Sequence, residues 1–213
     1  MNPNQKFVIT ISREMGSGGR TVGRKLAQRL GVKYCDKALI EGLVKEFHLS
    51  VEEIEKLKGG RQSWLSEFFV RLSPKATAER PYRVGKDGAP EMITPDDVFE
   101  VESRLLKELA TQESCVIAGR SGFFILKDLP NRIDIFLRAP LASRIRRVMR
   151  RQGLTEEEAI KAIRTVDEGR ENYVRHYAGT SRYDSRNYDL ILNVGGMDED
   201  AVVDLILQYI ASF

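Results

Sequence analysis

The first 31 residues constrain the fold more than any other part of the sequence. Residues 6–12 form a β-branched run with the composition of a buried strand. A turn rich in glycine follows, and residues 20–30 then carry apolar side chains at the spacing of an amphipathic helix that ends at Gly31. The order strand, glycine turn, helix is typical of the opening unit of a layered α/β fold.

Four further short apolar segments are predicted to be strands, namely residues 32–35, 115–118, 133–137 and 190–193. Helical patterns separate these segments, with amphipathic helices predicted at 96–113 and 198–210. Strands that alternate with helices in this way predict parallel βα units.

The region between the second and third predicted strands has a mixed character. Ser50 and Glu53 have the spacing of a capping box, which predicts a short helix over residues 50–58. Residues 75–95 are rich in proline and glycine and show no sustained period. We therefore expect an exposed loop over residues 75–95.

Composition excludes several classes of protein. Hydrophobic residues make up 42% of the chain and charged residues 31%, which is enough apolar material for one core and too mixed for a disordered tail. A net charge of +3 is weak evidence for a nucleic-acid partner. No apolar run approaches the roughly 20 residues that span a bilayer, and the N-terminus lacks the apolar stretch of a signal peptide. We expect a cytoplasmic protein with no membrane partner.

Cysteine and histidine are both scarce in this sequence. Cys35 and Cys115 each lie inside a short apolar segment and are predicted to be buried, reduced thiols. His48 and His176 are the only histidines, so the sequence offers little to a zinc ion.

Basic residues gather between Arg138 and Arg186, and nearly all of them are arginine. The planar guanidinium group matches the geometry of a phosphate better than the point charge of lysine does, so this usage favours phosphate binding. The alternative for any one of these arginines is a place on a solvated helix face, with a glutamate four residues away as its partner.

The glycine turn after the first strand is the clearest chemical signal. Glycines between a strand and a helix let backbone N–H groups and the helix N-terminus converge on an anion. The strict pattern G-x-x-x-x-G-K-[ST] is absent, because Arg20 stands where the lysine would stand and Glu14 where the first glycine would stand. We predict that the turn binds phosphate, against the alternative of a structural turn, through Gly16, Ser17, Gly18, Gly19, Arg20 and Thr21.

Three segments carry a resemblance to a known family. GSGGRT at residues 16–21 matches the kinase pattern G-S-G-K-G-T, with Gly19 at the lysine. VIAGRSG at 116–122 is similar to a strand-end Gly-Arg-Asp segment in which Ser121 replaces the Asp, and DEGR at 167–170 resembles the Asp-x-x-Arg of a lid region. Over residues 7–193 the chain resembles the cytidylate kinase-like family, relatives of the P-loop nucleoside-monophosphate kinases.

This resemblance implies a three-layer P-loop kinase fold of the α/β class with a central, mostly parallel five-stranded sheet. It implies a single domain over residues 1–213, with a helical and looped acceptor-binding insertion at 37–113 and an arginine-rich helical lid at about 150–186. The implied activity is ATP-dependent transfer of a phosphoryl group to a nucleoside monophosphate, CMP or dCMP, with Mg²⁺ as the metal ion.

The resemblance also implies roles in binding. Arg120 would grip the phosphate of the acceptor, with a buried structural ion pair as the alternative. Asp36 would orient the acceptor nucleotide or serve as the N-cap of the following helix. Thr21 would offer its hydroxyl group to Mg²⁺.

Roles in catalysis fall on four residues. The resemblance implies that Arg164, Asp167 and Arg170 close over the transferred phosphoryl group, and their spacing allows this because it places them near one helix face. A simple intrahelical ion pair between Asp167 and Arg170 is the alternative. Arg20 would replace the positive charge of the missing lysine.

Two other functions compete with this one. The missing lysine and the missing Asp of Gly-Arg-Asp favour a nucleotide-binding regulatory module that has weak or no turnover. The long region between Asp36 and Val116, where acceptor specificity would be decided, allows a kinase for a different small acceptor. Binding of DNA or RNA is the weakest alternative, because the sequence shows no nucleic-acid motif.

Overall fold

The structure is a computed structural model that describes residue 2 and residues 5–35, 82–84 and 90–213. Backbone contacts divide the chain into two compact units. One unit comprises Met1–Asp36 and Leu106–Phe213, and the other comprises Lys37–Leu105. Asp36 and the helix predicted at 50–58 lie outside the described residues.

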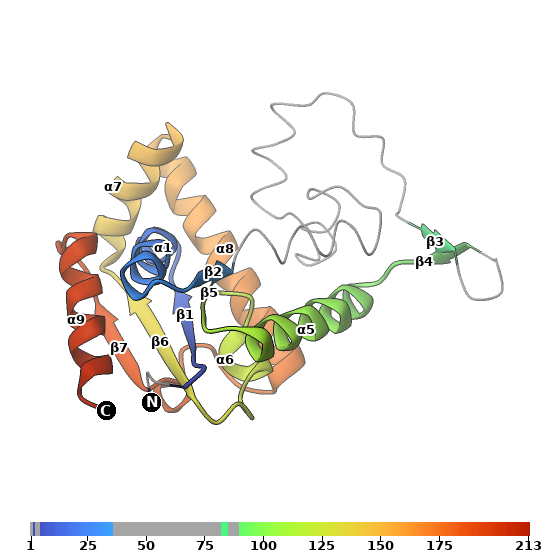
Figure 1. Ribbon diagram of the computed structural model, residues 1–213. Helices are drawn as coiled ribbons and strands as arrows, with labels where there is room; N and C mark the ends of the chain where they lie inside the picture. Colours follow the sequence, from blue (N-terminus) through green and yellow to red (C-terminus); the bar gives the residue numbers. More distant parts are fainter. Residues whose placement is uncertain (1, 3–4, 36–81, 85–89) are drawn as a thin grey trace. The chain divides into compact units, whose positions relative to one another are not determined.

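The first unit is built on a five-stranded parallel sheet (Figure 1). Its strands lie in the order β2-β5-β1-β6-β7, and every neighbouring pair is parallel. The sheet confirms the five predicted strands, which are β1 (Val8–Arg13), β2 (Lys33–Cys35), β5 (Cys115–Ala118), β6 (Arg132–Arg138) and β7 (Leu190–Asn193).

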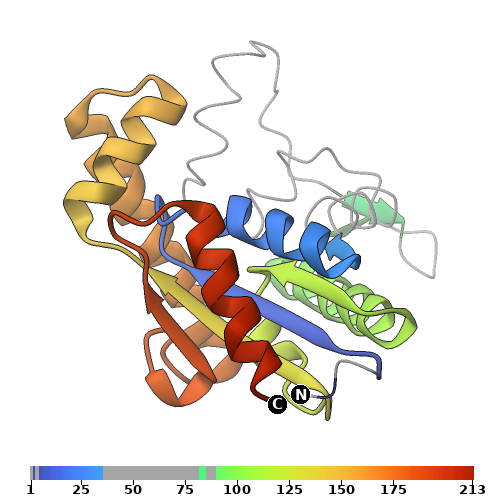
Figure 2. The ribbon, with the colours of Figure 1, turned by 60° about the vertical axis from the view of Figure 1, so that its left-hand side comes forward.

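Helices cover both faces of this sheet and make the three layers of the predicted α/β fold (Figure 2). The helices α1 (Gly19–Leu30) and α9 (Glu199–Ala211) lie on one face. The helices α6 (Gly122–Ile125) and α8 (Glu156–Ala178) lie on the other face. A single turn of 3₁₀-helix, η1 (Ser185–Asn187), precedes β7.

Alternating side chains of β1 explain how the two faces differ. Ile9 and Ile11 are completely buried and belong to the apolar core that includes Leu26 of α1 and Ile206 of α9. Thr10 points to the opposite face, where a Cβ atom at Gly122 would lie 3.2 Å from its Cγ2 atom. The absence of a side chain at Gly122 therefore lets α6 pack directly against β1.

The arginine-rich region forms two consecutive helices. The first is α7 (Leu141–Gln152), which ends at Gly153 in the left-handed conformation. The second is α8, whose N-terminus is a capping box: Glu158 N–H donates to the Thr155 hydroxyl, and the Thr155 N–H donates to the Glu158 carboxylate. Glycine and the capping box therefore fix where the chain reverses direction between the two helices.

The second unit contains a pair of short antiparallel strands, β3 (Tyr82–Val84) and β4 (Pro90–Met92). The prediction of a loop throughout residues 75–95 is wrong in this part, since strands of three residues are too short to show a periodic pattern. Helix α5 (Pro95–Gln112) follows, close to the predicted bounds. Its start is capped by Thr94, whose N–H donates to the Asp97 carboxylate at 2.8 Å.

Both cysteines are free and buried, as predicted, and they lie on the neighbouring strands β2 and β5. None of the helices in the described part of the chain is long and apolar enough to cross a membrane.

Candidate functional site

The loop that joins β1 to α1, residues 14–19, is called the glycine loop below. Gly16 and Gly18 have φ angles of 82° and 90°, in the left-handed region that favours glycine. A Cβ atom at Gly19 would lie 2.8 Å from the Arg13 Cβ atom, so the loop also packs closely on the end of β1. Within the described part of the chain, the amides of Gly16, Gly18 and Gly19 have no hydrogen-bond acceptor. The loop therefore presents unused N–H donors at the N-terminus of α1, as an anion-binding loop does.

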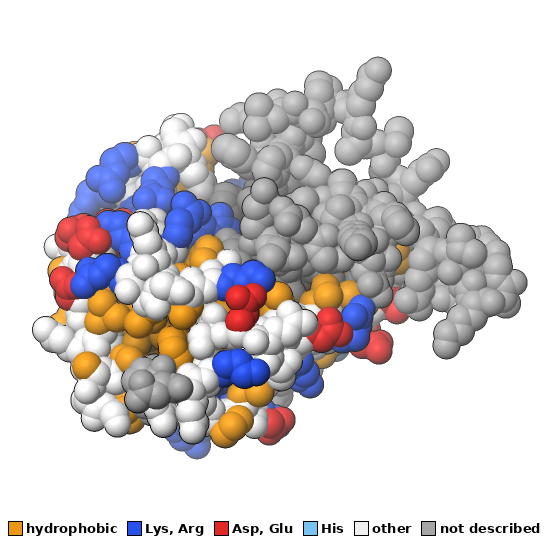
Figure 3. Space-filling model, viewed as in Figure 1, with side chains coloured by type: hydrophobic (Ala, Val, Ile, Leu, Met, Phe, Trp, Pro, Cys, Tyr) orange, Lys and Arg blue, Asp and Glu red, His pale blue; other side chains and the backbone are white. Residues whose placement is uncertain are grey.

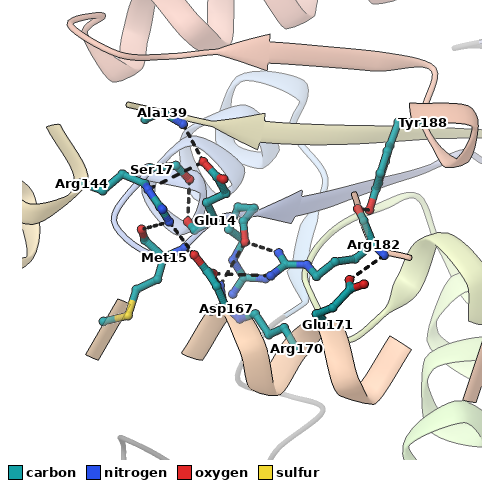
Figure 4. A network of polar contacts seen from close by, with 11 residues as sticks. Glu14, Met15, Ser17, Ala139, Arg144, Asp167, Arg170, Glu171, Arg182 and Tyr188 are labelled. Carbon is teal, nitrogen blue, oxygen red and sulfur yellow. Dashed lines mark hydrogen bonds and ion pairs between the residues drawn. The ribbon is translucent and has the colours of Figure 1, made fainter. Parts of the chain in front are cut away.

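The carboxylate of Asp167, on α8, holds the glycine loop through a hydrogen bond to its backbone (Figure 4). The Met15 N–H donates to Asp167 Oδ1 at 2.9 Å. Arg144, from α7, donates through Nη1 to Asp167 Oδ2 and, at 3.2 Å, to the Met15 carbonyl oxygen. Two helices of the arginine-rich region thus hold the backbone of one loop residue by both its donor and its acceptor.

Glu14 ties the same loop to the end of β6. Its Oε2 atom accepts a hydrogen bond from the Ala139 N–H at 2.9 Å and lies 3.7 Å from Arg144 Nε. The Ser17 hydroxyl donates to the Glu14 carbonyl oxygen at 2.9 Å, which closes the loop on itself. These contacts preorganise the loop before any ligand arrives.

Arg13, Arg170 and Arg182 form a group called the arginine cluster below. Arg170 Nη1 and Arg182 Nη2 both donate to the carbonyl oxygen of Arg13, at 3.0 and 2.6 Å. Asp167 Oδ1 lies 3.6 Å from Arg170 Nη1 and 3.4 Å from Arg182 Nη1.

The arginine cluster carries more positive charge than Asp167 balances. Burial and the neighbouring charges of Arg13 and Arg182 lower the pKa of Arg170 to about 9. Like charges held together at a glycine loop would be stabilised by an anion that shares them. The arrangement therefore suits a phosphate group.

Arg182 is held rigidly although its side chain is charged. The side chain is only 4% exposed, and its guanidinium carbon lies 5.6 Å from the ring centre of Phe136 and 5.2 Å from that of Tyr183. The Tyr188 hydroxyl donates to the Arg182 carbonyl oxygen at 2.7 Å, and the Arg182 N–H donates to Glu171 at 3.0 Å. Aromatic packing and backbone hydrogen bonds thus fix the position of this charge.

The turn after β5 brings a second backbone feature to the same edge of the sheet. Gly119, Arg120 and Ser121 have φ angles of 78°, 57° and 53°, so three successive residues are left-handed. For the two residues with side chains this conformation costs about 1–2 kcal/mol each. A Cβ atom at Gly119 would lie only 1.8 Å from Arg13 Nη1, so the Arg13 guanidinium group rests on this turn. The strained turn and the glycine loop therefore meet at the carboxyl ends of adjacent parallel strands, where ligands bind in such sheets.

A groove of about 560 Å³ lies along α8 beside the start of α7. Arg164 and Asp167 both line it, and Arg164 is exposed to solvent. The groove also contains Glu168 and Glu171, so its cationic and anionic side chains are mixed.

The structure brings some of the predicted site residues together and separates others. Gly16, Ser17, Gly18 and Gly19 form the glycine loop, and Asp167 and Arg170 lie directly beneath it. Arg20 is exposed on the first turn of α1, where its carbonyl oxygen accepts a hydrogen bond from the Tyr34 hydroxyl at 3.3 Å. Arg120 contributes its backbone to the strained turn, and the position of Asp36 lies outside the described residues.

Thr21 is the residue whose hydroxyl group the resemblance assigns to Mg²⁺. It is half-buried in the first turn of α1, and its N–H donates to the Gly18 carbonyl oxygen at 2.9 Å. Among the described residues, no three His, Cys, Asp or Glu side chains cluster in a way that could hold a metal ion. A hydroxyl group beside a phosphate-binding loop suits Mg²⁺, which takes most of its ligands from phosphates and water.

Sequence reasoning missed three arginines and one glutamate of this site, namely Arg13, Arg144, Arg182 and Glu14. Arg13 carried a usable signal, because it is the last residue of the first strand and directly precedes the glycine turn. Arg144 and Arg182 carried none that separates them from the other arginines between residues 138 and 186.

Comparisons with known proteins show the family of the chain. The model of the cytidylate kinase-like family matches residues 8–195. A cytidylate kinase from Sulfolobus acidocaldarius is 26% identical over 205 residues, which is 95% of this chain and 93% of that protein.

Solved structures give the same picture of the fold. An uncharacterized protein from Eubacterium ventriosum is 27% identical and superposes with a TM-score of 0.68, over 98% of this chain and 100% of its own. A shikimate kinase from Acinetobacter baumannii shares the fold, with a TM-score of 0.54 at 18% identity over 98% of this chain and 94% of its own.

Proposed function

Because this chain belongs to the cytidylate kinase-like family, we propose that it is an ATP-dependent phosphotransferase whose acceptor is a nucleoside monophosphate, CMP or dCMP. The observation that carries the proposal is the arginine cluster beside the glycine loop, where the guanidinium groups of Arg170 and Arg182 share the single carboxylate of Asp167 and both donate to the Arg13 carbonyl oxygen. Phosphoryl transfer needs little covalent help from a protein beyond positioned phosphates and cationic groups around the moving charge.

In this proposal the glycine loop binds the phosphates of ATP through the amides of Gly16, Gly18 and Gly19. Arg170 and Arg182 stabilise the negative charge on the transferred phosphoryl group, since both are already anchored next to the loop. Asp167 acts as a positioning residue rather than as a base, because its carboxylate is occupied by the Met15 N–H and by Arg144.

On the acceptor side, Arg120 holds the acceptor phosphate at the turn after β5, and Asp36 orients the acceptor nucleotide. Arg164 approaches the phosphates from the lid helices. Thr21 would hold Mg²⁺ with the ATP phosphates, and that ion would neutralise charge on the β- and γ-phosphate oxygens.

The proposal is tested by incubating the purified protein with Mg²⁺, ATP and each nucleoside monophosphate in turn. Ion-exchange chromatography would detect the matching diphosphate. We expect CDP or dCDP to form faster than any other product. ATP binding without any diphosphate would favour a regulatory module, which Gly19 at the lysine position of the kinase pattern suggests, or an acceptor of another class, which the region between Asp36 and Val116 allows.

Arg120→Ala should separate acceptor binding from ATP binding. Loss of a charge-assisted contact to a phosphate should raise the KM for CMP by about 10- to 100-fold, since such contacts contribute about 1.5–3 kcal/mol. The dissociation constant for ATP, measured by calorimetry, should change less than threefold. An equal loss of affinity for CMP and for ATP would identify Arg120 as a structural residue.

Arg170→Gln should remove most of the thermal stabilisation that ATP provides. A ligand at a hundredfold excess over its dissociation constant stabilises a protein by about 2.7 kcal/mol, which for a chain of this size raises Tm by about 5–10 °C. We expect less than half of this shift in Arg170→Gln.

The matched control for this experiment is Arg175→Gln on the same helix. The Arg175 side chain is 68% exposed and pairs with Glu171, four residues earlier on α8, rather than with Asp167. Its ATP-induced shift in Tm should equal that of the unaltered protein. Identical shifts in all three proteins would contradict the proposed role of Arg170.

A further inference from the structure

The glycine loop has no lysine, although a phosphate-binding loop of this kind usually carries one. Gly19 occupies the lysine position of the family pattern, and Arg20 is exposed on the first turn of α1. Lys25, further along α1, is paired with Asp200 at 2.6 Å. A positive charge above the loop must therefore come from another part of the chain.

Arg147, on α7, places its guanidinium group directly against the loop. A Cβ atom at Gly18 would lie 2.9 Å from both Cζ and Nη2 of Arg147. The Arg147 side chain is only 18% exposed, whereas the side chain of Arg151, one turn further along α7, is 55% exposed. Lys and Arg side chains gather over α7 in Figure 3. Among the arginines of α7, Arg147 is the one whose guanidinium group packs against Gly18.

Glu199, the first residue of α9, holds Arg147 in this position. Its carboxylate forms an ion pair with Arg147 Nη2 and lies 3.9 Å from Arg151 Nη2. The hydrogen bond from Arg147 lowers the pKa of Glu199 below its usual value. The start of α9 lies beside α7 in both ribbon views (Figures 1 and 2).

The electrostatics of this arrangement are unusual. The N-terminus of α1 carries a partial positive charge, and its N-cap Gly18 provides no side-chain hydrogen bond. A guanidinium group at this place is repelled by the helix dipole unless an anion lies close to both. Glu199 supplies the negative charge in the structure, and a phosphate on the loop amides would supply it in the complex.

We propose that Arg147 provides the positive charge above the phosphate-binding loop in place of the missing lysine, and that Glu199 competes with the bound phosphate for this guanidinium group. The inference rests on the proposed function, because it assumes that the loop binds ATP. It assigns to Arg147 the role that the sequence predicted for Arg20. On ATP binding, Arg147 exchanges the carboxylate of Glu199 for phosphate oxygens.

Calorimetry with ATP and with inorganic tripolyphosphate tests the role of Arg147. Arg147→Ala should weaken the binding of both ligands by at least 10-fold, because both present the same phosphate chain. Arg147→Lys should recover most of this loss, which a purely structural role would not allow. Arg150→Ala is the control, since Arg150 is exposed on the same helix and has no partner within the described residues, and its affinities should stay within twofold.

Glu199→Gln tests the competition. Removing this negative charge should tighten the binding of ATP and tripolyphosphate by about 3- to 10-fold. Asp200→Asn, which alters the neighbouring carboxylate paired with Lys25, should leave both affinities within twofold. Unchanged or weaker binding in Glu199→Gln would overturn the competition between Glu199 and phosphate.

The outcomes separate the inference from the function on which it rests. If the unaltered protein binds neither ATP nor tripolyphosphate, the proposed function fails and the inference fails with it. If the unaltered protein binds both and Arg147→Ala binds them equally well, only the inference fails. A loss of binding in Arg20→Ala under those conditions would return the role to Arg20. Thermal unfolding of each variant, and the rescue by Arg147→Lys, distinguish lost binding from lost structure.

Discussion

Replacing Asp167 by alanine should lower the free energy of unfolding by about 3–5 kcal/mol, as the removal of one partner from a buried ionic network does. The Asp167 side chain is only 10% exposed and accepts hydrogen bonds from the Met15 N–H and from Arg144. Without it, the guanidinium groups of Arg144, Arg170 and Arg182 keep their charges and lose the carboxylate between them. Urea denaturation followed by circular dichroism would measure the change.

Two further variants make this result specific. Asp184→Ala removes a carboxylate that is paired locally with the exposed Arg186, so its urea midpoint should stay close to that of the unaltered protein. Asp167→Asn keeps an oxygen acceptor for the Met15 N–H and loses only the charge. The urea midpoint of Asp167→Asn should lie between those of the unaltered protein and Asp167→Ala. An Asp167→Ala midpoint no lower than that of Asp184→Ala would contradict the network.

The strands and the glycine loop could be predicted because their signals are local. A β-branched run followed by glycines and an amphipathic pattern needs no information from the rest of the chain, and β1, the loop and α1 lie where this pattern places them. The helix α9 could be predicted for the same reason. Strand β6 extends one residue beyond its predicted segment at each end, as is usual at element boundaries.

The arginine cluster could not be predicted as a group, because its members converge from distant parts of the sequence. Arg170 and Arg182 lie 157 and 169 residues from Arg13, to whose carbonyl oxygen they donate. The Asp-x-x-Arg pattern singles out Arg170, whereas nothing in the sequence distinguishes Arg182 from the exposed arginines around it. Burial and the position of one carboxylate, Asp167, distinguish them, and both depend on how α8 packs against the glycine loop.

The left-handed conformation of the turn after β5 could not be predicted from the sequence either. Only Gly119 carries a sequence signal for a left-handed residue, whereas Arg120 and Ser121 normally avoid this conformation. The resemblance to a Gly-Arg-Asp segment predicted a role for Arg120 and said nothing of its backbone. Strain of this kind persists where the surrounding structure enforces it, which is common at ligand-binding sites.

Gly119→Ala should therefore reduce the proposed kinase activity by about 100-fold, the effect expected when a group of the site is displaced by about 1 Å. The new Cβ atom would lie 1.8 Å from Arg13 Nη1, so the guanidinium group of Arg13 must move away from the turn. The far end of a long side chain moves easily, and the loss should appear in kcat more than in stability. The left-handed backbone itself should cost about 1–2 kcal/mol, measurable by urea denaturation.

Gly153→Ala is the matched control, because it imposes the same kind of backbone strain without the collision. Gly153 ends α7 with a φ angle of 67°, and a Cβ atom there would meet nothing within 4 Å. Both variants should lose a similar amount of stability, about 1–2 kcal/mol, since both place alanine in the left-handed region. Only Gly119→Ala should lose activity. A similar loss of activity in the two variants would show that backbone strain alone explains the effect and that the displacement of the Arg13 guanidinium group does not.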